Sequence, residues 1–392
     1  MNNAAELVLG TIRAQVCGKQ YPIKHDLAPD ILKEAYALSK AHDVAHLVAA
    51  ELNTQKALQD NEINELFRKQ QILAVYRYER IGYELTEICR ILDEAGVPYM
   101  PLKGAVMRRY YPEPWMRTSS DIDILVKPKD VAAATDALVG KLNYQNQGAY
   151  DHDVQMYAPS GVHLELHFET IEEHYLANAN EVLKSIWDEH AWCISGQQYA
   201  MSNEMFYFYH IAHMAKHFTE AGCGIRFFVD LWLLNHRLEY DHQKKTELLQ
   251  AGQLLEFAQN AEHLSEVWFG EAVHTEITKR MEGYVLSGGI YGGVNNSIAV
   301  KSAKNGGRVG YAMYLVFRPY HELRRQYPVL YKHKWLYPFC QLHRWLCLIF
   351  NGGIVRAARL LKRGARVYEE TGSGVDKMLR DLNLAKKTKS NR

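Results

Sequence analysis

The chain has 392 residues, of which 47% are hydrophobic and 23% charged, and its formal net charge is +1 at pH 7. This length suggests roughly two or three domains of ordinary globular composition. A nearly neutral chain lacks the basic surface that broad nucleic-acid binding needs, so we expect neither a nucleic-acid partner nor a template-copying enzyme.

The cysteines and the apolar runs bear on the compartment. Six cysteines are scattered along the chain without a CxxC spacing, so we expect reduced thiols of a cytoplasmic protein rather than a zinc site or disulfides. No apolar run reaches the roughly 18 residues that a membrane-spanning helix needs. The N-terminal residues lack the basic and apolar regions of a secretory signal.

Helical patterns open the chain at residues 4–16, 29–50 and 60–95. The last of them carries apolar residues at intervals of four, three and four: Ile81, Leu85, Ile88 and Leu92. Gly96 is expected to end this helix. We expect His42 and His46, one turn apart, to pack or to face solvent rather than to bind a metal, since no third ligand is nearby.

Residues 97–126 predict a strand, a turn, a short helix, a loop and a second strand. The turn is Lys103-Gly104, and backbone N–H groups at such a turn bind phosphate. Side chains alternate along a strand, so Asp121 and Asp123 share one face of the second strand. Two neighbouring carboxylates repel each other without a cation, and Mg²⁺ prefers oxygen ligands. The alternative is a charged strand end in solvent.

A helix at 129–140 is followed by a predicted hairpin with strands at 152–157 and 162–168. His163, Glu165 and His167 share one face of its second strand. We expect Glu165 to add a third carboxylate to the site of Asp121 and Asp123. The alternative is a surface glutamate on an edge hairpin. His167 either supports the site or is a structural histidine held by hydrogen bonds.

A second polar cluster lies in residues 203–236. Its first helix places four polar side chains along one stripe: His210, His213, Lys216 and His217. We expect this stripe to face a substrate; a core helix with incidental histidines and a zinc or iron site are the alternatives. In the next helix, Arg226 and Asp230 are four residues apart and are expected to pair with each other.

The last third of the chain carries no recognised chemistry. Residues 287–311 are rich in Gly, Asn and Ser and predict a mobile linker, with a lid over the site as the alternative. Residues 341–363 predict a basic amphipathic helix broken at Gly352-Gly353. Such helices bind anionic membrane surfaces, but we expect this one to pack on the protein itself. The tail 385–392 is expected to be disordered.

Three motifs together resemble the nucleotidyltransferase superfamily of the DNA polymerase β type, and within it a family of uncharacterised nucleotidyltransferases: LKG at 102–104, RTSSDIDILV at 117–126 and ELH at 165–167. The superfamily has a glycine turn, then Asp-x-Asp on a strand and a third carboxylate on a later strand. The chain departs from it at Ala105, where Ser or Gly is usual, and at Glu165, where many members have Asp.

The resemblance implies a site and its ligands. Asp121, Asp123 and Glu165 are the implied catalytic and metal-binding residues, with Mg²⁺ or Mn²⁺ as the metal and an NTP as the substrate. Contacts to the nucleotide are implied for six further residues: Lys103, Gly104, Arg117, His167, Lys216 and His217. For Arg117 the alternative is that it anchors the loop before Asp121.

We therefore expect an α/β (α+β) fold with a polymerase-β-like nucleotidyltransferase core of mixed sheet, flanked by N-terminal helices and a C-terminal helical domain. The expected division is an N-terminal helical segment (1–70), the core (71–200), a helical domain closing over the site (201–286), a glycine-rich loop (287–311) and a C-terminal helical region with a basic tail (312–392).

The expected reaction moves a nucleotidyl group from an NTP to an acceptor hydroxyl of a small molecule, a glycan or a protein by a two-metal mechanism. Two alternatives stay open. One is a non-catalytic nucleotide-binding or scaffold protein with a decayed site. The other is a membrane-surface enzyme of glycan assembly, with peripheral membrane contact through the C-terminal helix.

Overall fold

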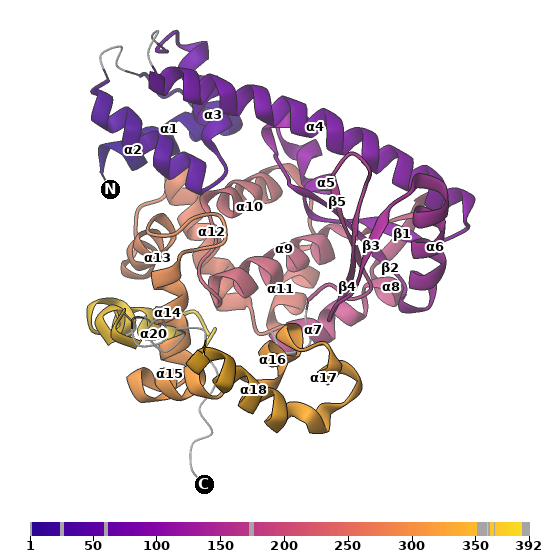
Figure 1. The fold of residues 1–392 in the computed structure, drawn as a ribbon. Coiled ribbons are helices and arrows are strands. Elements are labelled where there is room, and N and C mark those ends of the chain that lie inside the picture. Colours follow the sequence, from indigo (N-terminus) through magenta and orange to yellow (C-terminus); the bar gives the residue numbers. More distant parts are fainter. Residues whose placement is uncertain are drawn as a thin grey trace.

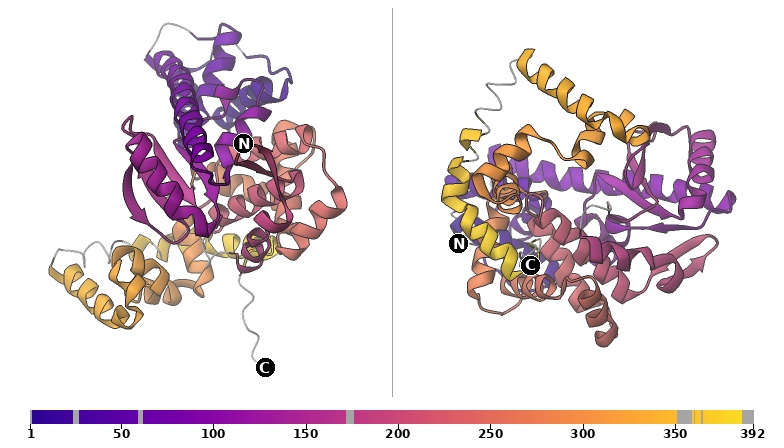
Figure 2. Two further views of the ribbon diagram at one scale, coloured as in Figure 1. Left: turned by 90° about the vertical axis from the view of Figure 1, so that its right-hand side faces the viewer. Right: turned by 90° about the horizontal axis from the view of Figure 1, so that it is seen from below.

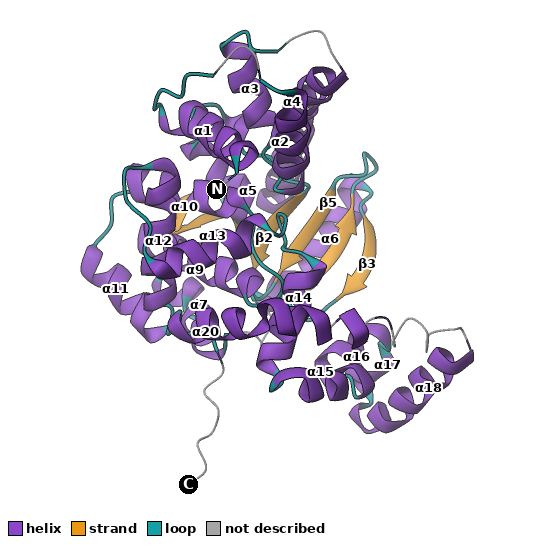
Figure 3. Ribbon diagram, turned by 90° about the vertical axis from the view of Figure 1, so that its left-hand side faces the viewer, coloured by secondary structure: helices purple, strands orange, loops and turns teal. Residues whose placement is uncertain are grey.

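The computed structural model describes residues 2–385 except 24–26, 59–61, 172–175, 351–358, 360 and 364. A seven-stranded sheet lies beside a larger array of helices (Figure 1; Figure 3). The strands are β1 (Tyr99–Pro101), β2 (Asp121–Val126), β3 (Gln145–Ala149), β4 (Asp153–Tyr157), β5 (His163–His167), β6 (Ala191–Ser195) and β7 (Gln198–Met201). The hairpin of β6 and β7 was not predicted from the sequence.

The strand order is β3-β4-β5-β2-β1-β7-β6. Strand β2 pairs in parallel with β5 and antiparallel with β1, and β1 pairs in parallel with β7. The sheet is therefore mixed, as expected. Because β2 and β5 are both interior strands, the alternative that placed Glu165 on an edge hairpin is wrong. Asp121 begins β2 and is partly exposed, but Asp123 is only 4% exposed, which argues against a charged strand end in solvent.

Two helices cover one face of this sheet: α4 (Glu62–Glu94) and α6 (Val131–Leu142). Ile88 of α4 and Leu138 of α6 pack in one core with Ile122, Ile124 and Leu164 of the central strands. The alternating pattern of β2 thus buries its apolar residues against these helices and leaves its carboxylates for the opposite face. Gly96 follows α4 with a φ of 67°, a conformation that favours glycine.

The remaining helices of the first 290 residues form one packed array, whose N-terminal group contacts α4 and whose larger group lies beside the other face of the sheet (Figure 1; Figure 2). The N-terminal group comprises α1 (Asn3–Cys17), α2 (Pro29–Ala41) and α3 (Ala45–Thr54). The larger group comprises α9 (Asn203–Phe218), α10 (Ile225–Arg237), α11 (His242–Ala251), α12 (Leu255–Phe269) and α13 (Glu276–Leu286). Between strands lie α5 (Lys103–Met107), α7 (Ala177–Lys184) and α8 (Ile186–Glu189). Residues of α1, α3, α9, α10 and α12 share a single core.

The glycine-rich segment 287–311 was expected to be a loop, and this expectation is wrong for most of its length. It contains α14 (Val294–Lys304) and the start of α15 (Gly307–Val316). The stretch before α14 is irregular, but backbone hydrogen bonds fix it: the Ile290 N–H bonds to the Ala41 carbonyl and the Gly293 N–H to the Ala221 carbonyl. Those contacts connect it to the ends of α2 and α9 rather than leave it as a linker.

The chain continues with α16 (Tyr320–Gln326), α17 (Val329–Lys332), α18 (Tyr337–Phe350) and α20 (Ser373–Asp381). The helix break predicted at Gly352-Gly353 and most of the basic tail lie outside the described residues. The outer face of α18 is exposed, so the expectation that its apolar residues pack on the protein is wrong for that face. Within the described ranges, no helix is both long and apolar enough to cross a membrane.

Candidate active site

The register of β2 against β5 brings the predicted carboxylates together. Asp121 lies opposite His163, and Asp123 lies opposite Glu165. One potential ligand atom from each of Asp121, His163 and Glu165 lies within 4.8 Å of the others, and the same holds for Asp123, Glu165 and His167. These side chains leave the sheet on the face opposite α4 and α6, because their apolar neighbours fill the core on that side.

Two cationic side chains contact the carboxylates. The Lys103 Nζ donates to the Asp123 Oδ1 at 2.6 Å and lies 3.9 Å from the Glu165 Oε2. The His167 Nε2 lies 2.9 Å from the same Asp123 Oδ1 and 3.3 Å from the Glu165 Oε2. His167 is only 1% exposed and sits behind the carboxylates.

These contacts set the charge states of the cluster. Burial alone would raise the pKa of Asp123, but Lys103 and His167 hold this pKa well below its usual range. The pKa of Glu165 is lowered despite burial, by the His167 hydrogen bond and Lys103. Burial disfavours protonated His167, yet hydrogen bonds to Asp123 and Glu165 raise its pKa to about 9. At neutral pH His167 is therefore protonated and donates to both carboxylates.

Asp121 differs from its two neighbours. Within the part of the chain that the structure describes, no residue forms a hydrogen bond or ion pair with its carboxylate. Burial raises its pKa, and the nearby charge of Asp123 raises it further. A divalent cation between these carboxylates would remove that penalty, and three carboxylates are the oxygen donors that Mg²⁺ and Mn²⁺ prefer. The residues present thus fit such a metal.

The turn at Lys103-Gly104 begins α5 directly beside the acidic cluster. The Leu102 N–H bonds to the Asp123 carbonyl at 2.9 Å, which fixes the turn to β2. A Cβ atom at Gly104 would lie 3.0 Å from the Ser119 Cβ and 3.2 Å from its Oγ, so any side chain at this position would force the loop before β2 to shift. Ser119 and Ser120 line the same cavity as Gly104 and were missed from the sequence, because nothing local marks their hydroxyls.

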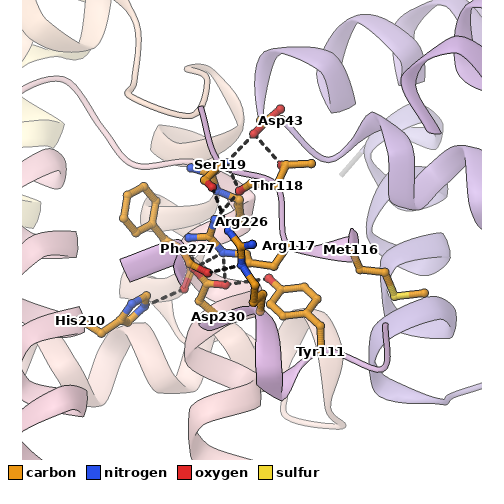
Figure 4. Close-up of polar contacts among 12 residues, drawn as sticks. Asp43, Tyr111, Met116, Arg117, Thr118, Ser119, His210, Arg226, Phe227 and Asp230 are labelled. Atoms are coloured by element: carbon orange, nitrogen blue, oxygen red, sulfur yellow. Dashed lines mark hydrogen bonds and ion pairs between the residues drawn. The ribbon is translucent and has the colours of Figure 1, made fainter. Parts of the chain in front are cut away.

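Arg117 anchors that loop to the helical array. Its Nε donates to the Asp230 Oδ1 at 2.8 Å and its Nη2 to the Asp230 Oδ2 at 2.8 Å (Figure 4). The Tyr111 hydroxyl donates to the same carboxylate at 2.7 Å. Burial opposes the charge on Asp230, but Arg117 keeps its pKa lowered. This arrangement favours the anchoring role among the two considered for Arg117.

The predicted pair of Arg226 and Asp230 is not formed, because Asp230 is taken by Arg117. Arg226 instead donates to the Asp43 carboxylate, in the turn after α2, and to the Thr118 carbonyl at 3.2 Å (Figure 4). The Thr118 hydroxyl also donates to Asp43, at 2.9 Å. Spacing of four residues permits a pair on one helix, but it does not exclude partners from elsewhere in the fold.

Helix α9 faces the acidic cluster. Its His210 is buried and contacts the Phe227 carbonyl at 3.1 Å, as a structural histidine would. The His213 and His217 Nε2 atoms lie 3.1 Å apart, and the Tyr291 ring centroid is 5.2 Å from that of His217. Among the described residues, no group with metal-ligand geometry includes these histidines, so the zinc or iron alternative has no support.

A cavity of about 620 Å³ joins the sheet, α5, α9 and α10. It is lined by eight of the nine predicted site residues: Lys103, Gly104, Arg117, Asp121, Asp123, Glu165, Lys216 and His217. His167 is the ninth and lies buried behind the carboxylates. The cavity also reaches Asp151 and Arg325, which the sequence did not suggest.

Fold and cavity define an α/β protein with an acidic site on the two central strands of a mixed sheet. A family model described as uncharacterised nucleotidyltransferase matches residues 32–270, and the chain belongs to this family. Searches among curated proteins and among solved structures give no match. The family match confirms the resemblance and covers all the predicted site residues, whereas Tyr291 and Arg325 of the cavity lie beyond it.

Proposed function

We propose that this protein transfers a nucleotidyl group from an NTP to an acceptor hydroxyl by a two-metal mechanism at Asp121, Asp123 and Glu165. The observation that carries the proposal is the register of β2 and β5, which presents these three carboxylates to one cavity beside Lys103. In the transfer, an acceptor oxygen bonds to the α-phosphorus, the bond to pyrophosphate breaks, and the acceptor hydroxyl loses its proton.

The three carboxylates would hold Mg²⁺ or Mn²⁺. When bound, such ions lower the pKa of the acceptor and neutralise charge on the triphosphate and the leaving group. The protein's own groups prepare the site: His167 donates to Asp123 and Glu165 and fixes their orientation. Lys103 balances their charge until metal and nucleotide bind.

The triphosphate would lie between Lys103-Gly104 and α9. Lys103 and Gly104 line one side of the cavity, and Lys216 and His217 line the other. Ser119 lies close enough to Gly104 to offer the hydroxyl that Ala105 lacks. Arg117 would act by holding the 117–120 loop rather than by touching phosphate, since Asp230 occupies its guanidinium group.

The cavity also supports the proposed domain division. Residues 71–200 supply its acidic wall, and residues 201–286 supply the facing helix, so closure of the helical domain on the sheet would enclose a nucleotide. The N-terminal segment 1–70 contacts the helical domain through the ion pair of Asp43 with Arg226. The acceptor class, a small molecule, a glycan or a protein, and the cytoplasmic location stay predictions.

A decayed, non-catalytic scaffold is the competing hypothesis, and the state of Asp121 argues against it. Burial and the charge of Asp123 raise the pKa of Asp121, so this carboxylate destabilises the folded protein when it is ionised without a metal. A scaffold that binds no metal would become more stable if Asp121 were replaced by a neutral residue. All three carboxylates are present, together with the histidine and the lysine that balance them.

The test is a thermal-shift titration with ATP, CTP, GTP and UTP in the presence and absence of Mg²⁺. A nucleotide at about 100 times its dissociation constant should stabilise the protein by roughly 2.7 kcal/mol. We expect one or more nucleotides to do so only with metal, and the Asp121→Asn/Asp123→Asn variant to lose the effect. Asp136→Asn, which changes an exposed carboxylate on α6, is the matched control. Equal stabilisation of the double variant and the wild type would refute the proposed site.

A further inference from the structure

The basic residues of this protein are concentrated in one stretch of its sequence. Between Glu322 and Glu369 there is no Asp or Glu, and there are ten Lys or Arg residues. Since the whole chain has a net charge of +1, the remainder carries a net charge of −9. A charge separation of this size in a nearly neutral protein suggests a partner that is itself negatively charged.

The described part of this stretch also exposes a continuous apolar stripe. On α18, Phe339, Leu342, Leu346 and Ile349 recur at intervals of three, four and three, and they are 62%, 51%, 44% and 54% exposed. Phe350 ends the stripe at 81% exposure, and Trp335 precedes it at 68%. Exposed apolar residues at helical spacing form one face, and a face of this kind marks a binding surface.

The orientation of α18 is fixed by contacts on its other side. The Gln341 Nε2 and the Tyr337 hydroxyl both donate to the Arg318 carbonyl, at 2.5 and 2.6 Å. Farther along the helix, the Arg344 Nη2 donates to the Leu315 carbonyl and the Trp345 Nε1 to the Val316 carbonyl, both at 2.8 Å. These polar contacts hold the inner face of α18 against the end of α15, and the exposed apolar stripe lies on the opposite face of the helix.

Cations border the stripe. Lys332 and Lys334 are exposed just before α18, and no hydrogen bond or ion pair joins the side chain of either to another described residue. Apolar and aromatic residues on one face with neighbouring cations are the pattern of helices that lie in the headgroup region of an anionic bilayer. A protein partner would need an acidic surface with an apolar centre, a narrower requirement.

The same region contacts the rim of the active-site cavity. Asp151, between β3 and β4, accepts a hydrogen bond from the Tyr331 hydroxyl at 2.7 Å and pairs with Arg324 at 2.8 Å. Asp151 also lines the cavity. A surface bound through α18 would therefore lie near this cavity.

We propose that residues 329–350 form a docking surface for an anionic lipid membrane, with the apolar stripe of α18 entering the headgroup region and Lys332 and Lys334 contacting acidic headgroups. This binding is peripheral and independent of nucleotide transfer. It goes beyond the family match, which ends at residue 270.

The test is co-sedimentation of the full chain with vesicles of phosphatidylcholine alone and of phosphatidylcholine mixed with phosphatidylglycerol. We expect binding to the mixed vesicles that weakens with salt. Phe339→Ser/Leu342→Ser should abolish it, and Lys332→Gln/Lys334→Gln should weaken it by about fivefold for each cation removed. The control Ile72→Ser/Val273→Ser changes two residues that are 69% and 80% exposed elsewhere and should leave binding intact.

Three results would overturn the proposal. The wild type could stay in the supernatant with both vesicle types, or the stripe variant could bind as well as the wild type. Alternatively, sedimentation velocity without lipid could show a wild-type dimer that the stripe variant converts to a monomer, with no vesicle binding by either; the face would then be an interface between two copies of this chain. Nucleotide binding, measured separately, should be the same for the stripe variant and the wild type.

Discussion

Arg117 and Asp230 form a buried bidentate ion pair that joins the loop before β2 to helix α10, with the Nε–Oδ1 and Nη2–Oδ2 distances both 2.8 Å. They are 113 residues apart in the sequence. Asp230 is 1% exposed and Arg117 7% exposed. The pair therefore fixes the loop that carries Ser119 and Ser120 relative to the helices on the other side of the cavity.

Removing one partner should leave an uncompensated buried charge. We predict that Arg117→Met lowers the free energy of unfolding by about 3–5 kcal/mol, because Asp230 keeps its charge without its main partner. Urea denaturation followed by circular dichroism measures the loss. The double variant Arg117→Met/Asp230→Leu should recover a large part of it. Arg90→Met, which removes an exposed cation paired on α4, is the control and should change stability little. An equal loss of unfolding free energy in Arg117→Met and Arg90→Met would contradict the prediction.

The close approach of Gly104 to Ser119 predicts a compensating pair of substitutions. Gly104→Ala places a Cβ 3.0 Å from the Ser119 Cβ, and such overpacking costs about 1–3 kcal/mol. Ser119→Gly removes the clashing atom, so Gly104→Ala/Ser119→Gly should be more stable than Gly104→Ala alone. Thermal unfolding of the three variants decides the matter. A double variant whose loss equals the sum of the single losses would show that the two positions do not touch.

His42 should make stability depend on acidity. Its ring is buried, its Nδ1 accepts the Ile225 N–H at 3.2 Å, and burial lowers its pKa from 6.5 to about 4. Below pH 6.5 the His42 ring binds a proton in the unfolded chain, whereas in the folded chain it stays neutral until about pH 4. Neutral His42 therefore makes its full contribution to the free energy of unfolding above pH 6.5. As the pH falls toward 4, this contribution is lost, by about 3 kcal/mol in all.

The difference between two variants isolates this effect. His42→Asn keeps an acceptor near the Ile225 N–H but does not titrate, so its urea midpoint should fall less than that of the wild type between pH 7 and pH 4.5. His242→Asn changes an exposed histidine and should follow the wild type. A His42→Asn profile parallel to the wild type would show that His42 does not carry the dependence.

Lys103 competes with a metal for Asp123 and Glu165. We predict that Lys103→Met binds Mn²⁺, without nucleotide, at least about tenfold more tightly than the wild type. A unit charge at about 4 Å contributes roughly 4 kcal/mol at an effective dielectric of 20, and the Nζ lies 3.9 Å from Glu165. Calorimetry measures the affinity. Asp121→Asn should bind more weakly and Lys129→Met, on an exposed side chain, should match the wild type. Weaker binding by Lys103→Met would argue against a metal at these carboxylates.

The errors made from the sequence share one physical cause. Arg226 and Asp230 were expected to pair because they are four residues apart. In the structure, Asp230 pairs with Arg117 and Arg226 pairs with Asp43. The glycine content of 287–311 predicted a loop, whereas packing stabilises α14. Local spacing and propensity describe what a segment permits, and contacts with distant segments decide among the permitted states.

The acidic pattern and the faces of its strands follow from local sequence. Asp121 and Asp123 alternate with Ile122 and Ile124, and Glu165 alternates with Leu164 and Leu166, so the strand period alone assigned each side chain to a face. Those faces are the ones the structure has. The assignment of side chains to faces was correct because strand alternation depends only on neighbouring residues.

Which residues complete the cavity, and which surface stays exposed, depends on contacts between distant segments. The register of β2 and β5 sets Asp123 opposite Glu165, Lys103 reaches them from α5, and Asp151 joins from the β3–β4 turn. The outward direction of the α18 stripe likewise follows from its hydrogen bonds to the end of α15. Each of these depends on strand pairing or on contacts between segments far apart in the chain, which no local pattern encodes.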